Sequence, residues 1–221
     1  MMETVVLVHG LWMNGTESAL LRRRIGDAGF SPRQFSYRSV TETVDDNAER
    51  LKRFIDELPE GKVHLVGHSL GGLLMLKMLA SHADHREGRL ICMGSPLSGS
   101  RVANSLAGLP GGSALLGHSA QALIVEQPWR WSGTRQLGLI AGSSAVGLGR
   151  LLTNLPEPND GSVAVDETRL AGAADHIVLK VSHTLMLFSP EVAQQIVHFL
   201  RCGCFDHGDD RQGSAPRATG S

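Results

Sequence analysis

Ser69 stands between Gly67 and Gly71 in the stretch VHLVGHSLGG, at the end of an apolar run and at the start of a long apolar helical pattern. Glycines two residues away on either side let the backbone turn sharply enough to lift the hydroxyl clear of a sheet. The helix behind the turn aims its free N–H groups at the same point, led by that of Leu70. This G-x-S-x-G pattern predicts a serine nucleophile with an oxyanion donor beside it, in preference to a glycine-rich helix start with an incidental serine.

A histidine has to activate this serine, because a hydroxyl is a weak nucleophile until a base takes its proton. The chain contains 10 histidines. His183, in VSHT, follows the last apolar run, HIVLKV, and is therefore expected at the same edge of a parallel sheet as Ser69. The remaining candidates lie inside a predicted strand, at its far end, or in helical and loop segments without a converging partner: His64, His82, His85, His118, His176 and His198. We predict that His183 is the base.

A carboxylate has to orient the histidine, and the turn-rich segment PEPNDGSV before the last strand supplies Asp160. Asn-Asp-Gly is also typical of a turn with no chemical role. Asp166, Glu157 and Glu167 are the alternatives, and Asp166 is the most credible of them because it too precedes the last strand. The order serine, Asp160, histidine along the chain matches the order of triads built on this kind of strand-turn-helix elbow, so we prefer Asp160.

A second oxyanion donor is predicted after the first apolar run, in the segment His9-Gly10-Leu11-Trp12. The glycine lets the backbone approach a substrate carbonyl closely. Our first candidate is the Leu11 N–H, and the Trp12 N–H is the second. We expect His9 to brace this loop, and His68 to brace the elbow, by hydrogen bonding rather than by moving protons.

These residues need a scaffold that brings distant segments to one edge, and the chain predicts such a scaffold. Short β-rich runs alternate with helical patterns, which is typical of an α/β fold with a mostly parallel central sheet and helices on both faces. The predicted strands are residues 4–10, 33–38, 62–67, 89–96, 136–142 and 176–181, and the predicted helices are residues 16–29, 45–61, 70–83 and 189–201. In such a sheet the chemistry lies at the carboxyl ends of the strands.

The pattern indicates one domain over residues 1–201, interrupted by a short cap or lid-like insertion over about residues 97–135. Glycine, serine, leucine and alanine dominate the insertion and loosen its periodicity. The tail 202–221 is polar and rich in glycine, and we expect it to be disordered. Its two cysteines and single histidine lack a fourth ligand and a folded frame, so no metal site and no other cofactor is predicted.

Composition and charge exclude several classes of protein. A chain of 221 residues with 42% apolar residues can bury a substantial core. The formal net charge is −1 and the basic residues are scattered, which leaves no footprint for nucleic acid or an acidic membrane. The three cysteines form no framework of pairs, and neither a signal peptide nor a transmembrane run is visible, so we expect a cytoplasmic protein.

Four segments occur in a fixed order along the chain: VVLVHGLW, VGHSLGG, PNDGSV and VSHT. With these segments, the chain from Thr4 to Arg201 resembles the α/β-hydrolases of the bacterial lipase and esterase type. The resemblance implies the α/β-hydrolase fold and the hydrolysis of carboxylic esters through an acyl-enzyme, without a cofactor. It implies that Ser69 is the nucleophile, Asp160 the acid and His183 the base. It also implies that Leu11 and Leu70 are the oxyanion donors. The N-terminal antiparallel strands of larger members have no counterpart in this pattern.

The expected substrate is a small ester with an apolar acyl group, because the insertion offers apolar residues for an acyl pocket: Leu106, Leu109, Leu115, Leu116, Leu123, Trp129 and Trp131. Core packing is the better interpretation for most of them. Trp12, Tyr37 and Arg38 are expected at the same edge of the sheet as Ser69, within reach of a ligand. Two alternatives stay open on the same scaffold: an acyltransferase or thioesterase and, from a different class, a binding protein with a relic triad.

Overall fold

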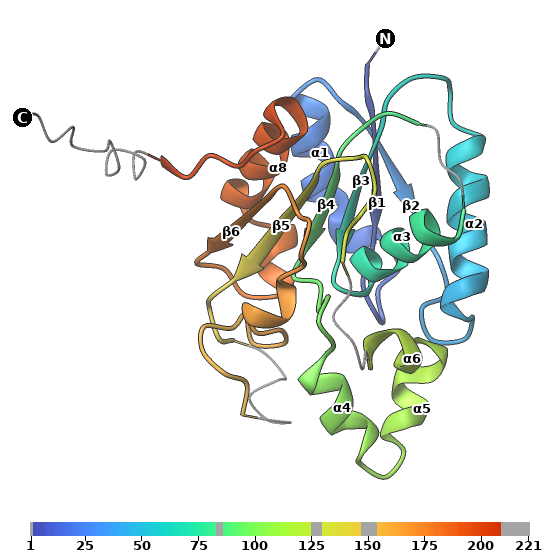
Figure 1. The fold of residues 1–221 in the computed structure, drawn as a ribbon, viewed down its shortest axis with the longest axis vertical. Coiled ribbons are helices and arrows are strands. Elements are labelled where there is room, and N and C mark those ends of the chain that lie inside the picture. The colour runs from blue at the N-terminus through green and yellow to red at the C-terminus, as the bar shows by residue number, and fades with distance from the viewer. Residues whose placement is uncertain (1, 83–85, 125–129, 147–153, 209–221) are drawn as a thin grey trace, which may run out of the picture.

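All neighbouring strands of the central sheet pair in parallel in the part of the chain that the structure describes (Figure 1). The structure is a computed structural model that describes residues 2–82, 86–124, 130–146 and 154–208. The strands are β1 (Thr4–Val8), β2 (Ser31–Phe35), β3 (Val63–His68), β4 (Leu90–Met93), β5 (Leu137–Gly142) and β6 (Asp175–Leu179). Their spatial order is β2-β1-β3-β4-β5-β6, which places β3, the strand before Ser69, inside the sheet.

The longer helices cover the two faces of the sheet: α1 (Ala19–Asp27), α2 (Val44–Asp56), α3 (Leu70–Ser81) and α8 (Pro190–Cys202). α2 and α3 pack on one face, and α1 and α8 pack on the other (Figure 1). Short 3₁₀ helices cover Thr16–Ser18, Asp166–Thr168 and Thr184–Leu187. The predicted α/β fold with helices on both faces is confirmed. None of the described helices has the length and apolar character that crossing a membrane requires.

Burial on both faces explains the uninterrupted apolar run of β1. Val6 and Val8 belong to the core cluster under α2 and α3, whereas Val5 and Leu7 belong to the cluster under α1 and α8. None of these four side chains is more than 3% exposed. A parallel sheet covered on both sides has no solvent face, so its central strands show no alternation of apolar and polar residues.

A cap of short helical pieces connects β4 to β5: α4 (Arg101–Ala107), the helix α5 (Gly112–Leu116), the 3₁₀ helix Gly117–Ser119 and α6 (Ala120–Leu123). Figure 1 shows these pieces beyond the carboxyl ends of the strands. Gly111 and Gly117 interrupt the helical path with φ values of +76° and +57°, which favour glycine. The pieces lie within the insertion expected over residues 97–135, of which residues 125–129 lie outside the described residues.

The second strand lies earlier in the chain than predicted. β2 covers Ser31–Phe35, whereas the sequence pattern indicated residues 33–38. The parallel register pairs Val8 with Phe35, and β1 ends at Val8, so the pairing ends there too. Aromatic residues favour strands only where a neighbouring strand is available, which is why Tyr37 lies beyond the sheet.

The start of the predicted tail is folded rather than disordered, which corrects the expectation for residues 202–208. α8 ends in a left-handed cap at Gly203, with φ 79°. Phe205 follows, is 2% exposed, and lies 4.7 Å from Phe199 between ring centroids. Burial of one large aromatic ring outweighs the polar composition around it. Residues 209–221 lie outside the described residues.

Candidate active site

The elbow after β3 holds Ser69 in a backbone conformation that few side chains adopt, with φ 55° and ψ −123°. A Cβ at Gly67 would lie 2.5 Å from the Gly72 nitrogen, and a Cβ at Gly71 would lie 2.2 Å from the Val8 oxygen. Both clashes are with backbone atoms, which cannot move aside as a flexible side chain can, so both positions require glycine. Strained backbone of this kind costs about 1–3 kcal/mol and is concentrated at functional sites.

His183 is held both by its main chain and by its ring. Its Nδ1 lies 2.8 Å from Oδ2 of Asp160, and its backbone N–H donates to the main-chain oxygen of Asp160 at 2.9 Å. A proton on Nδ1 makes the first of these bonds and leaves Nε2 free to act as a base. Gly94, with φ 57°, permits the close packing, because a Cβ there would lie 3.1 Å from Nδ1. The structure therefore brings together the histidine and the carboxylate that the sequence singled out.

Asp160 is fully buried, and its second carboxylate oxygen is also occupied. Oδ1 accepts from the backbone N–H groups of Ser162 and Val163 at 2.9 and 2.7 Å. These donors compensate the buried negative charge and aim Oδ2 at the histidine. The competing carboxylate, Asp166, is exposed and pairs with both terminal nitrogens of Arg101 at 2.9 Å, which lowers its pKa.

Glu167, the next competitor, links the cap to the acid-bearing loop. Its side chain is buried, and this burial raises its pKa. Oε1 accepts from the Arg101 N–H at 2.7 Å at the start of α4, and Oε2 accepts from the Ala164 N–H at 2.6 Å. Glu157 is exposed. Neither glutamate is paired with His183, so Asp160 is the carboxylate that the geometry joins to this histidine.

His68 packs directly behind the histidine loop and is buried. Its Nε2 lies 3.0 Å from the main-chain oxygen of His183, so Nε2 carries the proton and donates it. Its Nδ1 is buried without a hydrogen-bond partner among the described residues. Burial lowers the pKa of His68 to about 3, and the His183 ring, 4.8 Å away between centroids, acts in the same direction. His68 is thus a neutral brace for the histidine loop.

The loop after β1 lies close against the elbow. A Cβ at Gly10 would lie 3.1 Å from the Cβ of Ser69, so a larger residue would push the two apart. The Trp12 N–H donates to Oγ of Ser39 at 3.1 Å, whereas the Leu11 N–H has no partner among the described residues. In this loop, the Leu11 N–H is therefore the donor left for a ligand, together with the free N–H groups at the start of α3.

Tyr37, expected from the sequence to touch a ligand, is absent from the lining of the pocket that contains Ser69 and His183. It is buried, and its hydroxyl donates to the main-chain oxygen of His9 at 2.9 Å. The two rings stack 4.3 Å apart, and Nε2 of His9 accepts from the Tyr37 N–H at 3.1 Å. Burial raises the pKa of Tyr37 and lowers that of His9. The pair braces the loop after β1, residues 9–12. Arg38 is exposed, and its Nη1 lies 3.9 Å from Oε1 of Glu42.

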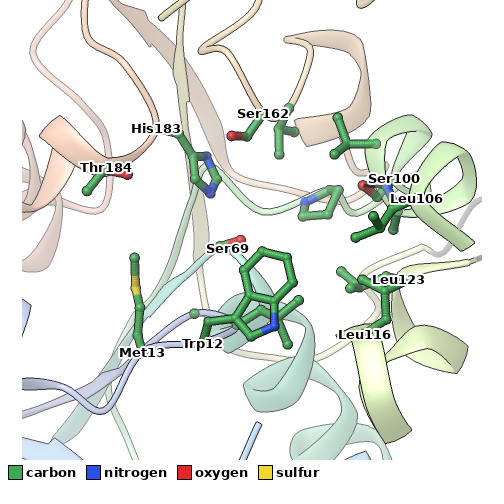
Figure 2. A pocket seen from close by; sticks show the side chains of 16 residues that line it. Trp12, Met13, Ser69, Ser100, Leu106, Leu116, Leu123, Ser162, His183 and Thr184 are labelled. Carbon is green, nitrogen blue, oxygen red and sulfur yellow. Dashed lines mark hydrogen bonds between the residues drawn. The ribbon is translucent and has the colours of Figure 1, made fainter. Parts of the chain in front are cut away.

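Ser69 and His183 line one pocket of about 200 Å³ between the loop after β1 and the cap. Figure 2 shows the serine hydroxyl and the histidine ring facing the same space. Three leucines of the cap line one side of the pocket: Leu106, Leu116 and Leu123. Met13 and Thr184, near the sheet edge, line the other side. His183 is the single ionisable side chain in this lining, so the pocket suits an uncharged group.

The apolar residues expected to form an acyl pocket divide into two groups. One group lines the pocket and also packs in the core: Leu106, Leu116 and Leu123. The other lies away from the pocket: Leu109, Leu115 and Trp131. Trp129 lies outside the described residues. Trp12 lines the pocket as expected of a ligand contact, and its Nε1 also donates to the Leu115 oxygen at 2.9 Å.

Sequence reasoning named Leu106 of α4 but missed Ser39 and two further pocket-facing residues of that helix. Ser39 is buried beyond the carboxyl end of β2, and that position at the active edge was a usable signal. Val102 and Ala103 line the pocket from the cap. Nothing in the loose pattern of the insertion indicates which face of α4 turns inward.

No group of three or more His, Cys, Asp and Glu side chains that could hold a metal ion occurs among the described residues. All three cysteines are free thiols, and Cys92 is buried. In the folded part of the tail, Nε2 of His207 lies 3.0 Å from Oδ1 of Asp175, so this histidine has a structural partner.

Comparisons with known proteins agree with this fold. The sequence matches the family described as "Alpha/beta hydrolase family" over residues 5–217, and no curated protein matches it. The structure is similar to Bacillus licheniformis lipase BlEst2 in its mature form, with a TM-score of 0.71 and 18% identity over 90% of this chain and 91% of that chain. An esterase (EaEST) from Exiguobacterium antarcticum gives a TM-score of 0.66 and 18% identity over 90% and 92% of the two chains. Carboxylesterase CesB from Bacillus subtilis gives a TM-score of 0.56 and 17% identity over 91% and 84%.

Proposed function

This chain belongs to the alpha/beta hydrolase family, and from that premise we propose that it hydrolyses carboxylic esters, with Ser69 as nucleophile, His183 as base and Asp160 as the acid that orients the base. One observation carries the proposal: Ser69 and His183 line the same pocket, and Asp160 lies 2.8 Å behind the histidine ring. The strained elbow supports it, because such strain persists only where the surrounding structure holds it.

In the acylation step, Nε2 of His183 takes the proton of Ser69 as Oγ bonds to the ester carbonyl carbon. The electron pair of the carbonyl moves to its oxygen, and the N–H groups of Leu11 and Leu70 hold this oxyanion. Its collapse breaks the bond to the alcohol oxygen, which leaves with the proton from Nε2. Asp160 keeps the proton on Nδ1 and stabilises the positive ring between the two transfers.

In the deacylation step, water takes the place of the alcohol. Nε2 of His183 removes a proton from the water as its oxygen bonds to the acyl carbon. The bond between the acyl carbon and Oγ of Ser69 then breaks, and the serine recovers its proton from Nε2. The products are one carboxylic acid and one alcohol, and the scheme balances without a cofactor.

We further propose that both parts of the substrate are uncharged and that the larger, apolar part lies under the cap. Three leucines and Val102 line that side of the pocket, and a charged group there would lose its hydration without gaining a partner. The opposite side of the pocket is lined by Met13 and by Thr184, which carries a hydroxyl group. An ester with an apolar acyl chain and a small alcohol fits this division.

The test is a series of acetyl, butanoyl, hexanoyl and decanoyl esters measured with the wild type and with Ser69→Ala. Loss of the nucleophile lowers turnover by roughly 10⁴-fold or more, as in other serine enzymes. Ser105→Ala is the matched control, because this serine is on α4 outside the pocket lining, and its turnover should equal that of the wild type. Wild-type turnover by Ser69→Ala would rule out Ser69 as the nucleophile.

A fluorophosphonate probe separates the remaining alternatives. It should label the wild type at Ser69 and leave Ser69→Ala unlabelled, whereas a binding protein with a relic triad would stay unlabelled in both forms. Product analysis with and without an added alcohol or thiol then distinguishes hydrolysis from acyl transfer. A thioester series in the same assay shows whether sulfur leaving groups are preferred to oxygen ones.

A further inference from the structure

Residues 9–12 form the loop that carries the proposed oxyanion donor Leu11, called here the oxyanion loop. Ser39, which does not line the pocket, anchors one side of this loop. The backbone N–H of Trp12 donates to Oγ of Ser39 at 3.1 Å. Trp12 has a φ of 60°, a left-handed conformation that costs energy for a side chain as large as tryptophan. Contacts with neighbouring residues are therefore needed to hold the peptide between Leu11 and Trp12 in this turn. Ser39 supplies one of them by accepting the hydrogen bond from the Trp12 N–H.

Ser39 also connects this turn to the cap. Its main-chain oxygen accepts from the hydroxyl of Ser119, and the oxygen of its neighbour Val40 accepts from the His118 N–H at 3.0 Å. Both donors belong to the 3₁₀ helix between α5 and α6. Ser39 is therefore a junction, with its side chain on the oxyanion loop and its main chain on the cap.

We propose that Ser39 is a positioning residue that orients the Leu11 N–H toward the oxyanion, an inference that rests on the ester hydrolysis proposed above. The Leu11 N–H has to remain unpaired to receive the substrate oxygen, so no hydrogen bond of its own can hold it in place. Its orientation depends on the adjacent peptide, which Oγ of Ser39 fixes through the Trp12 N–H. Without this acceptor, the Trp12 N–H turns toward solvent or the pocket and rotates the loop.

The distinguishing measurement is the separation of kcat from KM in Ser39→Ala, with Ser39→Cys as a second variant of nearly native size and weaker acceptor strength. An oxyanion exists only after attack, so its stabilisation affects kcat, whereas Ser39 does not line the pocket and KM should stay within about twofold. We expect kcat to fall by about tenfold, less than the 10²–10³-fold that follows removal of a whole donor. The loss should be equal for acetyl and hexanoyl esters, because both form the same oxyanion.

Ser119→Ala is the matched control. Ser119 is buried like Ser39 and donates its hydroxyl to the same residue, yet this variant leaves the bond from Trp12 to Oγ intact. Its thermal unfolding should shift about as much as that of Ser39→Ala, while its kcat should stay within about twofold of the wild type. This comparison separates a lost orientation from a merely loosened fold.

Three results would overturn the inference: an unchanged kcat in both Ser39 variants, an equal loss of kcat in Ser119→Ala, or a loss confined to hexanoyl esters. Failure of the proposed function has a different signature. In that case the wild type itself shows no ester turnover that depends on Ser69 and no labelling by the fluorophosphonate, whatever residue occupies position 39.

Discussion

The proposed active site has two halves, an acid–base half and an oxyanion half, and they are held in place differently. The acid–base half is Asp160 and His183, and contacts from the sheet edge itself fix it: the Asp160 main chain and carboxylate hold the histidine, and His68 holds its carbonyl group. The oxyanion half is the turn at Leu11 and Trp12. That turn depends on Ser39 beyond β2 and on the cap, which receives the Trp12 ring N–H.

The difference follows from what each half has to do. A buried carboxylate has to be fully hydrogen-bonded, so the bonds that compensate its charge also fix its position. An oxyanion donor has to be left unbonded until the substrate arrives, so its own hydrogen bond cannot position it. The neighbouring peptide has to be tied down instead. Loss of the bonds that Trp12 makes to Ser39 and Leu115 should therefore affect the oxyanion half before it affects the acid–base half.

The largest expected effect comes from breaking the acid–base half. Asp160→Asn keeps the size of the side chain but presents an amide to Nδ1 of His183, which favours the wrong tautomer. In a serine enzyme this substitution lowers kcat by about 10⁴-fold, and we expect a loss of that order. Steady-state hydrolysis of a short-chain ester measures it.

Asp166→Asn is the matched control, because Asp166 makes an exposed ion pair with Arg101 and does not contact His183. Exposed pairs contribute about 0–1 kcal/mol, so both stability and kcat should remain near wild type. If Asp166→Asn were the variant that lost activity, the assignment of the acid would be reversed.

A smaller effect should appear in the pH dependence of stability, through the brace between the elbow and the acid–base half. Burial lowers the pKa of His68 to about 3, whereas an unfolded histidine titrates near 6.5. Between these values the unfolded chain binds a proton that the folded chain does not. The free energy of unfolding therefore falls as the pH falls, by about 1.4 kcal/mol per pH unit, or about 2 kcal/mol between about pH 6.5 and pH 5.

Urea unfolding of His68→Gln at the same two pH values measures this contribution, because the glutamine amide donates a hydrogen bond but does not titrate there. The variant should show a shallower pH dependence than the wild type by about 2 kcal/mol. Burial also lowers the pKa of His9, His64 and His176, and these residues contribute equally to both proteins. Identical pH dependences would show that His68 titrates normally in the folded state.

The smallest expected effect probes the cap side of the pocket. Val102→Asp places a charge on the half-buried, pocket-facing side of α4. An apolar chain should then bind less well, and kcat/KM for a hexanoyl ester should fall by about tenfold relative to an acetyl ester. Asn104→Asp adds the same charge to the exposed face of the same helix and should leave this ratio unchanged. An unchanged ratio in Val102→Asp would place the acyl chain elsewhere.

Several features could be predicted because each depends on a short stretch of chain. The elbow at Ser69 is one of them, since a Cβ at Gly67 would clash with the backbone of Gly71 and Gly72 in the same turn. The helices α2 and α8 are others, since Thr43 and Ser189 cap their first turns through side-chain hydrogen bonds. The position of Tyr37 could not be predicted, because its contact is with His9 in the loop after a different strand.

The sequence by itself determined the alternation of strands and helices, the turn that presents Ser69, and the chain order of the three polar residues. Local sterics and hydrophobic periodicity decide these features, and both are written in neighbouring residues. Only the tertiary structure decided that Asp160 rather than Asp166 contacts His183, that residues 202–208 are folded, and that Ser39 accepts a hydrogen bond from the Trp12 N–H. These features depend on contacts between segments far apart in the chain, and packing selects such contacts from among partners that are locally equivalent.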